Sequence, residues 1–259
     1  MQFFLKLFKS SRLILLFAVL CGIILYAALQ ATETVCTTTA NGFLNDPKIY
    51  GEYEGSAQNA DCGVDLSLNY EVASVTAVSW QGNGGPLMGT LINRGSLTLE
   101  APAELRGSFE NKGSLILIGG SDENDTLSIA GDWKNSKTVT ADSGRIRWQR
   151  TSLLEDGSVE LNSTQLEVSG SVQQIGGVFN AEQSILSLSG TTEWFSAEPL
   201  TFGELKLKGN NLVLGSSTTK LSFNQTVLIS DPSSQIIIGK GILNLTGGLQ
   251  LERGYVSIS

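Results

Sequence analysis

The sequence contains no histidine, and it has only three cysteines and five prolines among 259 residues. Without histidine the chain cannot form a Ser-His-Asp or Cys-His catalytic group, or a metal site with imidazole ligands. Bases are also few: 17 against 25 acids, a formal net charge of −8 at pH 7. This balance argues against nucleic acid as a partner, because phosphate binding requires clustered Lys and Arg. Glycine, in contrast, is abundant, with 29 residues.

The first 31 residues differ from the rest of the chain. Three bases and no acid precede a mostly apolar run over residues 13–29, LILLFAVLCGIILYAAL. This length lies between a signal-peptide core of about 7–15 residues and a membrane span of about 17–25. The small-residue pattern ending at Ala31 suits signal peptidase, so we expect residues 1–31 to be a cleaved signal peptide. The alternative is an uncleaved anchor, in which residues 13–29 are the only part to contact a membrane.

Both interpretations place residues 32–259 outside the cytoplasm, on the cell surface or extracellular, with the periplasm as an alternative. Cys36 and Cys62 then remain as an even pair, which in an exported protein predicts a disulfide. Two free thiols are the alternative. Loop signals and short alternating segments at 64–68 and 72–78 predict that residues 32–80 form a small β-rich cap tied by this bridge.

From about residue 91 onward, short pieces of the form G-S-L-x-L recur. The clearest copies are residues 95–99, 113–117 and, with valine, 157–161. No stretch after residue 32 shows a sustained apolar repeat at helical spacing, so we expect almost no helix there. Asparagine precedes the glycine corner in the N-x-G-S-L form, where it can bond to a neighbouring repeat. The asparagines are Asn93, Asn111 and Asn135, and the hydrophobic residues Ile92, Phe109 and Trp133 ahead of them are expected to pack inward.

The apolar positions repeat at a period of about 20 residues. Successive pairs are Leu97–Leu115, Leu186–Leu205, Leu205–Val227, Val227–Leu249 and Leu221–Leu243. Several short strands per period predict an all-β parallel β-helix over residues 81–259, with about eight coils whose inward residues form ladders. A β-sandwich or β-roll array is the architectural alternative.

The N-x-G-S-L-x-L coils behind an export signal resemble bacterial repetitive β-solenoid surface proteins, of the filamentous-haemagglutinin-like adhesin and autotransporter passenger types. The resemblance covers about residues 90–259 and is one of pattern. It implies a right-handed β-helix on a cell surface or in a matrix. It carries no catalytic residue over to this chain, which shows no membrane β-barrel or sorting tail at its C-terminus.

The densest acidic cluster is Asp122, Glu123 and Asp125. Carboxylates on a short loop are candidate Ca²⁺ ligands, although the order of an EF-hand loop is absent. The alternative is a solvated loop without metal. No other cofactor is predicted.

Some β-helices cleave polysaccharides with grouped carboxylates. Here the acids are scattered; Glu160 and Glu167 could face one groove, but no spacing singles out a pair. We therefore expect no enzyme, with a polysaccharide lyase or hydrolase as the alternative. Trp194 is the candidate for stacking on a sugar, and core packing is the alternative for all four tryptophans.

Two further features concern the surface. Glycosylation sequons begin at Asn124, Asn162, Asn224 and Asn244. Residues 235–259 are strand-like almost to the last residue, which predicts unpaired strand edges and association with another copy or a partner. A longer native chain and a self-capping last strand are the alternatives.

Together these features predict an exported structural or adhesive surface protein that presents a rigid solenoid and associates end to end. Its expected partners are other copies or a host or matrix surface. The alternative function is a glycan-binding or glycan-cleaving β-helix.

Overall fold

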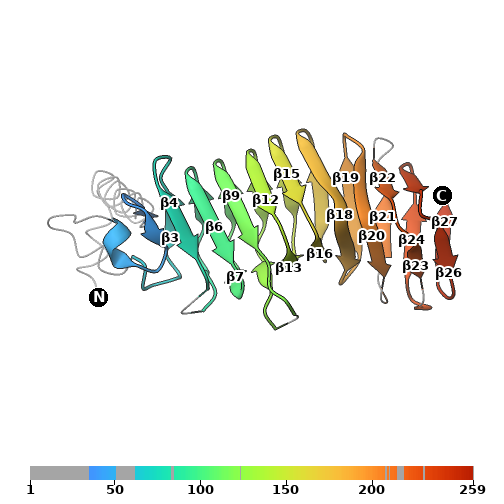
Figure 1. The fold of residues 1–259 in the computed structure, drawn as a ribbon, viewed down its shortest axis with the longest axis horizontal. Helices are drawn as coiled ribbons and strands as arrows, with labels where there is room; N and C mark the ends of the chain where they lie inside the picture. Colours follow the sequence, from blue (N-terminus) through green and yellow to red (C-terminus); the bar gives the residue numbers. More distant parts are fainter. Residues whose placement is uncertain are drawn as a thin grey trace, which may run out of the picture. The chain divides into compact units, whose positions relative to one another are not determined.

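A computed structural model describes residues 35–258 except 51–61, 83–84, 123, 208, 210, 215–218 and 230. These residues form a right-handed parallel β-helix of about nine turns (Figure 1). The one helical element among them is the 3-10 turn η1 (Pro47–Tyr50). No described helix is long and apolar enough to cross a membrane. The predicted signal segment 1–31 lies outside the described residues.

The strands of successive coils form an 11-stranded sheet and a 16-stranded sheet. The first is face A, and the second covers two faces, B and C, because two long strands join them. Face A contains β1 (Val35–Thr37), β3 (Asn69–Val72), β5 (Leu91–Asn93), β8 (Phe109–Asn111), β11 (Trp133–Asn135), β14 (Ser152–Leu154), β17 (Ser171–Gln174), β19 (Thr192–Ser196), β21 (Asn211–Leu214), β24 (Gln235–Ile238) and β27 (Tyr255–Ile258).

Face B contains β2 (Gly42–Phe43), β4 (Ala77–Trp80), β6 (Ser96–Glu100), β9 (Ser114–Ile118), β12 (Thr138–Ala141), β15 (Ser158–Leu161), β22 (Lys220–Phe223) and β25 (Ile242–Leu245). Face C contains β7 (Ala103–Leu105), β10 (Leu127–Ile129), β13 (Gly144–Trp148), β16 (Thr164–Val168), β23 (Val227–Ile229) and β26 (Leu249–Leu251). The longer strands β18 (Val178–Leu188) and β20 (Leu200–Leu207) run from face B onto face C.

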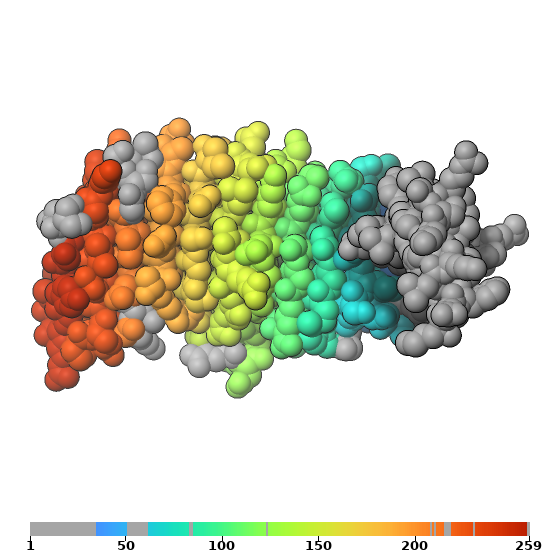
Figure 2. All heavy atoms as spheres, turned by 180° about the vertical axis from the view of Figure 1, so that it is seen from behind, coloured from blue at the N-terminus to red at the C-terminus, as the bar shows by residue number. Residues whose placement is uncertain are grey.

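Each coil buries its apolar face only by stacking on its neighbours. On face B, Leu97 pairs with Leu115, which pairs with Val139, and all three side chains are fully buried. Residues between them along each strand face outward, as the two-residue period of a strand requires. Figure 2 shows the coils as successive bands along the solenoid. Core burial is therefore a sum of contacts between neighbouring coils.

The register confirms the period predicted from the sequence. The aligned pairs include Leu97–Leu115, Leu186–Leu205, Leu221–Leu243 and Val227–Leu249, and the pair Lys206–Leu228 accounts for the remaining spacing. The expected number of coils was about eight and the structure has about nine. The difference arises because β3 and β4, in the range assigned to the cap, already pair with β5 and β6.

The asparagines of the N-x-G-S-L motif form a buried ladder at the corner between faces A and B. Asn93 Nδ2 donates to Asn111 Oδ1 at 2.7 Å, and Asn111 Nδ2 donates to Asn135 Oδ1 at 2.7 Å. The expectation for Ile92 is wrong, because Leu91 pairs with Phe109 and points inward while Ile92 pairs with the outward Glu110. Leu91 lies two residues before Asn93, just as Phe109 lies two residues before Asn111.

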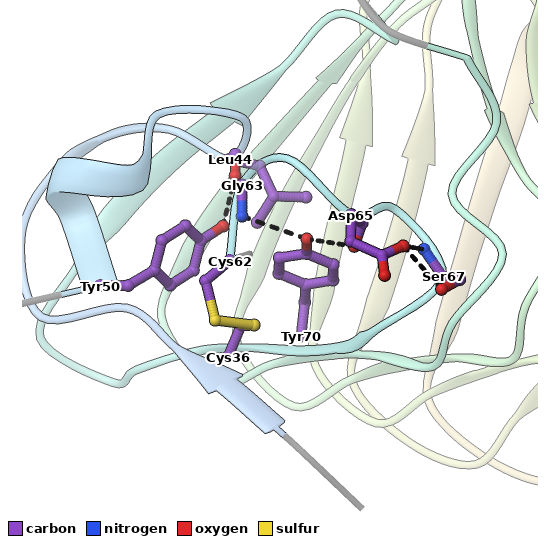
Figure 3. Close-up of a disulfide and its surroundings, with 8 residues drawn as sticks. All are labelled: Cys36, Leu44, Tyr50, Cys62, Gly63, Asp65, Ser67 and Tyr70. Carbon is purple, nitrogen blue, oxygen red and sulfur yellow. Dashed lines mark hydrogen bonds between the residues drawn. A yellow bond between two sulfur atoms is a disulfide. The ribbon is translucent and has the colours of Figure 1, made fainter. Parts of the chain in front are cut away.

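The N-terminal cap is closed by a disulfide between Cys36 and Cys62 (Figure 3). Behind it the Tyr50 hydroxyl donates to the Leu44 carbonyl, and Tyr70 Oη donates to the Asp65 carbonyl at 2.8 Å. Burial, with the nearby charges of Tyr70 and Asp46, raises the pKa of Tyr50. Leu44, Ile49 and Tyr50 are buried, so the cap covers apolar surface at this end.

Neither of the two alternating segments expected in the cap forms a single strand. Residues 64–68 form turns, because Asp65 Oδ1 accepts hydrogen bonds from Ser67 N at 2.9 Å and Ser67 Oγ at 2.6 Å. These bonds also lower the pKa of Asp65. The second segment is split into β3 and β4 by a turn in which Thr76 Oγ1 donates to the Ala73 carbonyl at 2.9 Å.

Candidate functional site

Trp194 lies inside the solenoid and not on its surface. Its side chain is fully buried and packs edge-on against Phe179 and Phe202, with ring centroids 6.2 and 5.6 Å away. This position removes Trp194 from the candidates for stacking on a sugar. The other three tryptophans are buried too, as the core-packing alternative expects.

The acidic loop containing Asp122 projects from the corner between faces B and C (Figure 1). It lengthens its coil, so that Phe109 and Trp133 pair although they lie 24 residues apart. Asp122 Oδ1 accepts backbone hydrogen bonds from Asn124 at 2.8 Å and Asp125 at 3.0 Å. Glu123 lies outside the described residues. In the part of the chain that the structure describes, no group of three His, Cys, Asp or Glu side chains could hold a metal ion.

All four sequon asparagines are exposed. Asn124 lies in the acidic loop, Asn162 and Asn224 at corners that follow face B strands, and Asn244 on the outer side of β25. Their exposure makes each side chain reachable from solvent.

A depression in the outer surface lies over β10 on face C, and we name it the face C trough. The outward residues of β10 and the position after it are small, Ser128 and Ala130. Ser128 pairs with Glu104 on β7 and with Arg147 on β13, so longer side chains stand on both sides. The trough therefore results from two small residues flanked by strands that carry long polar ones.

The trough consists of two adjoining hollows that share Glu104 and Gln149, with volumes of about 370 and 420 Å³. One hollow lies between the loop around residue 85 and the acidic loop, and the other lies toward face A. The first is lined by Gly82, Gly85, Pro86, Pro102, Ala103, Glu104, Asn124, Thr126, Ser128, Arg147 and Gln149. The second is lined by Met88, Glu104, Arg106, Ala130, Gln149 and Arg150.

Three arginines stand on the two rims of the trough. Arg106 Nη2 lies 3.0 Å from Glu104 Oε2, and this hydrogen bond raises the pKa of Arg106. Arg147 Nη2 lies 3.0 Å from Glu167 Oε2. Arg150 is exposed and forms no ion pair with any described residue. The rims therefore present guanidinium donors above a short polar floor.

In the ladder that crosses the trough, Ser128 and Arg147 lie between two glutamates. Glu104 and Glu167 belong to one outward ladder and are separated by three strand steps. At about 4.8 Å a step, their backbones lie roughly 14 Å apart. Glycoside hydrolases place the two carboxyl groups about 5–9.5 Å apart.

The inward side chains of the last described coil are only partly covered by the described residues. Leu249 and Leu251 pair with Val227 and Ile229, which are fully buried, yet they are 41% and 50% exposed. We name the inward-facing residues of this coil the end face: Leu243, Leu245, Leu249, Leu251 and Val256. Each of β25, β26 and β27 pairs with only one described strand. The end face therefore combines apolar side chains with three strand edges.

No family model, curated protein or solved structure matches this chain. The function is therefore inferred from the fold and these two surfaces.

Proposed function

We propose that this chain is an exported structural or adhesive surface protein whose solenoid displays polar outer faces. The fold supports a scaffold role, because the core continues without interruption from Tyr70 on β3 to Ile236 on β24. Along each strand the outward positions are free to vary without disturbing the ladders. Such a stack presents many side chains at a fixed spacing of about 4.8 Å.

Export is supported by the disulfide and by the basic, apolar N-terminus. A disulfide indicates a non-reducing compartment. N-terminal sequencing of the protein recovered from producing cells is expected to begin at Thr32, with the cysteines oxidised. Recovery of the protein from the cytoplasm with reduced cysteines would contradict export.

The end face is the single observation that carries the assembly part of the proposal. The end face and the strand edges beside it belong to one coil, residues 239–258. These residues include two bases and one acid in a strongly acidic chain, so two copies meet there with little repulsion. The partner we assign is a second copy of this chain.

The geometry favours pairing between two such coils over an alternating chain of copies. The cap already covers apolar surface at the other end through Leu44, Ile49 and Tyr50. The same surface on both copies then forms the contact, which closes a two-fold dimer and does not propagate into a filament. We therefore propose a pair joined through β25–β27 in preference to a filament.

A pair of matched variants tests this assembly. Leu251→Glu places a charge in the end face, whereas Leu228→Glu places the same charge on the outer side of face C, where Leu228 is 42% exposed. Sedimentation velocity is expected to show dimers for the wild type and Leu228→Glu, and monomers for Leu251→Glu. A wild-type monomer, or a dimer unaffected by Leu251→Glu, would rule out the end face as the interface.

A second candidate function is glycan binding, and the face C trough is the observation that favours it. The trough is long, shallow and lined by side chains that donate and accept hydrogen bonds, among them Gln149 and Asn124. The spacing of Glu104 and Glu167 favours binding over cleavage.

A further inference from the structure

We propose that the face C trough binds an extended polysaccharide that carries carboxylate or sulfate groups. This inference rests on the second candidate function and names its ligand class. It is independent of the end face, since the trough lies over β10, many coils away from β25–β27.

The width of the trough suits one extended chain. Its rims belong to β7 and β13, which flank β10 on either side. Two strand steps separate the rims by about 10 Å between backbones. Ser128 and Ala130 fill little of that space, so a polymer can run parallel to β10 between the rims.

The charge of the rims selects the ligand. Arg106, Arg147 and Arg150 each carry a planar guanidinium that can bond carboxylate or sulfate oxygens in pairs. Glu104 and Glu167 engage Arg106 and Arg147 through Nη2 and leave further N–H donors of each group available. Arg147 Nε is buried and has no hydrogen-bond partner among the described residues. Arg150 supplies an exposed charge that no described acid pairs.

Other polymers fit the trough less well. Among the described residues, no aromatic side chain lines either hollow, so they offer no ring for the stacking that bases or neutral sugar rings use. β10 is paired on both sides, so it offers no strand edge to the backbone of a peptide. An anionic polysaccharide needs neither stacking nor a strand edge.

Binding of defined polysaccharides by the purified protein tests this inference. The probes are polygalacturonate for carboxylate, dextran sulfate for sulfate, and dextran as the neutral match of dextran sulfate. Isothermal titration is expected to show binding of at least one anionic polymer, weakened by salt, and no binding of dextran. Arg150→Gln is expected to weaken that binding about tenfold, the equivalent of roughly 1.4 kcal/mol.

Two controls separate charge from shape. Arg94→Gln removes an arginine on face A that pairs with Glu71, and it is expected to leave binding unchanged. Ala130→Trp fills the trough without changing charge and is expected to abolish binding, whereas Thr140→Trp on the outer side of face B is expected to retain it. Circular dichroism checks that all four variants fold.

The outcomes distinguish this inference from the function on which it rests. Equal binding of dextran and dextran sulfate would overturn the anionic ligand and keep glycan binding. No binding of any probe would overturn both and leave the scaffold proposal standing. Anionic binding that survives both Arg150→Gln and Ala130→Trp would place the site elsewhere, and preferential binding of single-stranded DNA would replace the polysaccharide.

Discussion

At the residue scale, Asn111 connects three consecutive coils through one amide. Its Oδ1 accepts from Asn93, and its Nδ2 donates to Asn135 Oδ1 at 2.7 Å and to the Thr138 carbonyl at 3.2 Å. The side chain is fully buried, so no water replaces a lost partner at its surface. A buried polar group left without a partner lowers the stability of the fold. The stability of these three coils therefore depends strongly on the Asn111 amide.

Asn111→Ala is expected to lower the free energy of unfolding by about 3 kcal/mol, because it leaves Asn93 and Asn135 each short of a partner. The exposed Asn224 gives the matched control, and Asn224→Ala is expected to change stability by less than about 0.5 kcal/mol. Chemical denaturation of both variants measures the difference. Equal stability of the two would show that the ladder is not a stabilising element.

Tyr50 makes the cap sensitive to alkali. Its hydroxyl must keep its proton to donate to the Leu44 carbonyl, and burial raises its pKa above the ordinary value of 10.0. The unfolded chain loses the proton near pH 10 while the folded chain retains it, so the contribution to stability is complete below that pH and declines above it. We expect the melting temperature to fall above about pH 10, and less steeply in Tyr50→Phe. An identical alkaline decline in the two proteins would contradict this.

At the scale of the element, the corners limit which residues the repeat accepts. Gly157 precedes β15 with φ 81°, and a Cβ there would lie 2.3 Å from the Lys137 carbonyl oxygen of the coil before. Gly157 is therefore required both by the backbone conformation and by the close approach of the neighbouring coil, whereas Gly95 and Gly113 are required by close approach alone.

Gly157→Ala is expected to destabilise the protein by about 3 kcal/mol, since steric overlap of the new methyl group with the neighbouring coil adds to the backbone strain. Gly248 has a similar φ of 92° but no atom within 4 Å of a built Cβ, so Gly248→Ala is expected to cost only about 1 kcal/mol. Thermal unfolding of both variants separates the two contributions. If Gly248→Ala lost as much stability as Gly157→Ala, close contact with the neighbouring coil would have no part in the requirement for glycine.

Sequence patterns predicted the elements better than the sites. Leucine spacing determines which residues stack, so the period and the inward ladders could be read directly. Where two apolar residues are adjacent, the sequence does not show which of them points into the core. Trp194 and Phe195 lie on opposite sides of β19, and only the packing of neighbouring coils places Trp194 inside. The trough could not be predicted, because the acidic loop lengthens one coil and disrupts the spacing that would align Glu104, Ser128 and Arg147.

At the scale of the whole molecule, the two ends of the solenoid differ in how their core is covered. At one end a disulfide and buried residues of the cap close the stack. At β25–β27 the ladders continue to the last described coil and remain open, with Leu251 half exposed. This asymmetry, and the low charge of the last coil, are the reasons for assigning a second copy to the end face.

Hydrogen exchange of the backbone amides of β25–β27, followed as protein concentration is raised, tests the central proposal most directly. Pairing with a second copy covers these strand edges, so their exchange is predicted to slow with concentration while that of β11–β16 stays constant. Rapid exchange of β25–β27 at every concentration would contradict an assembly built through the end face.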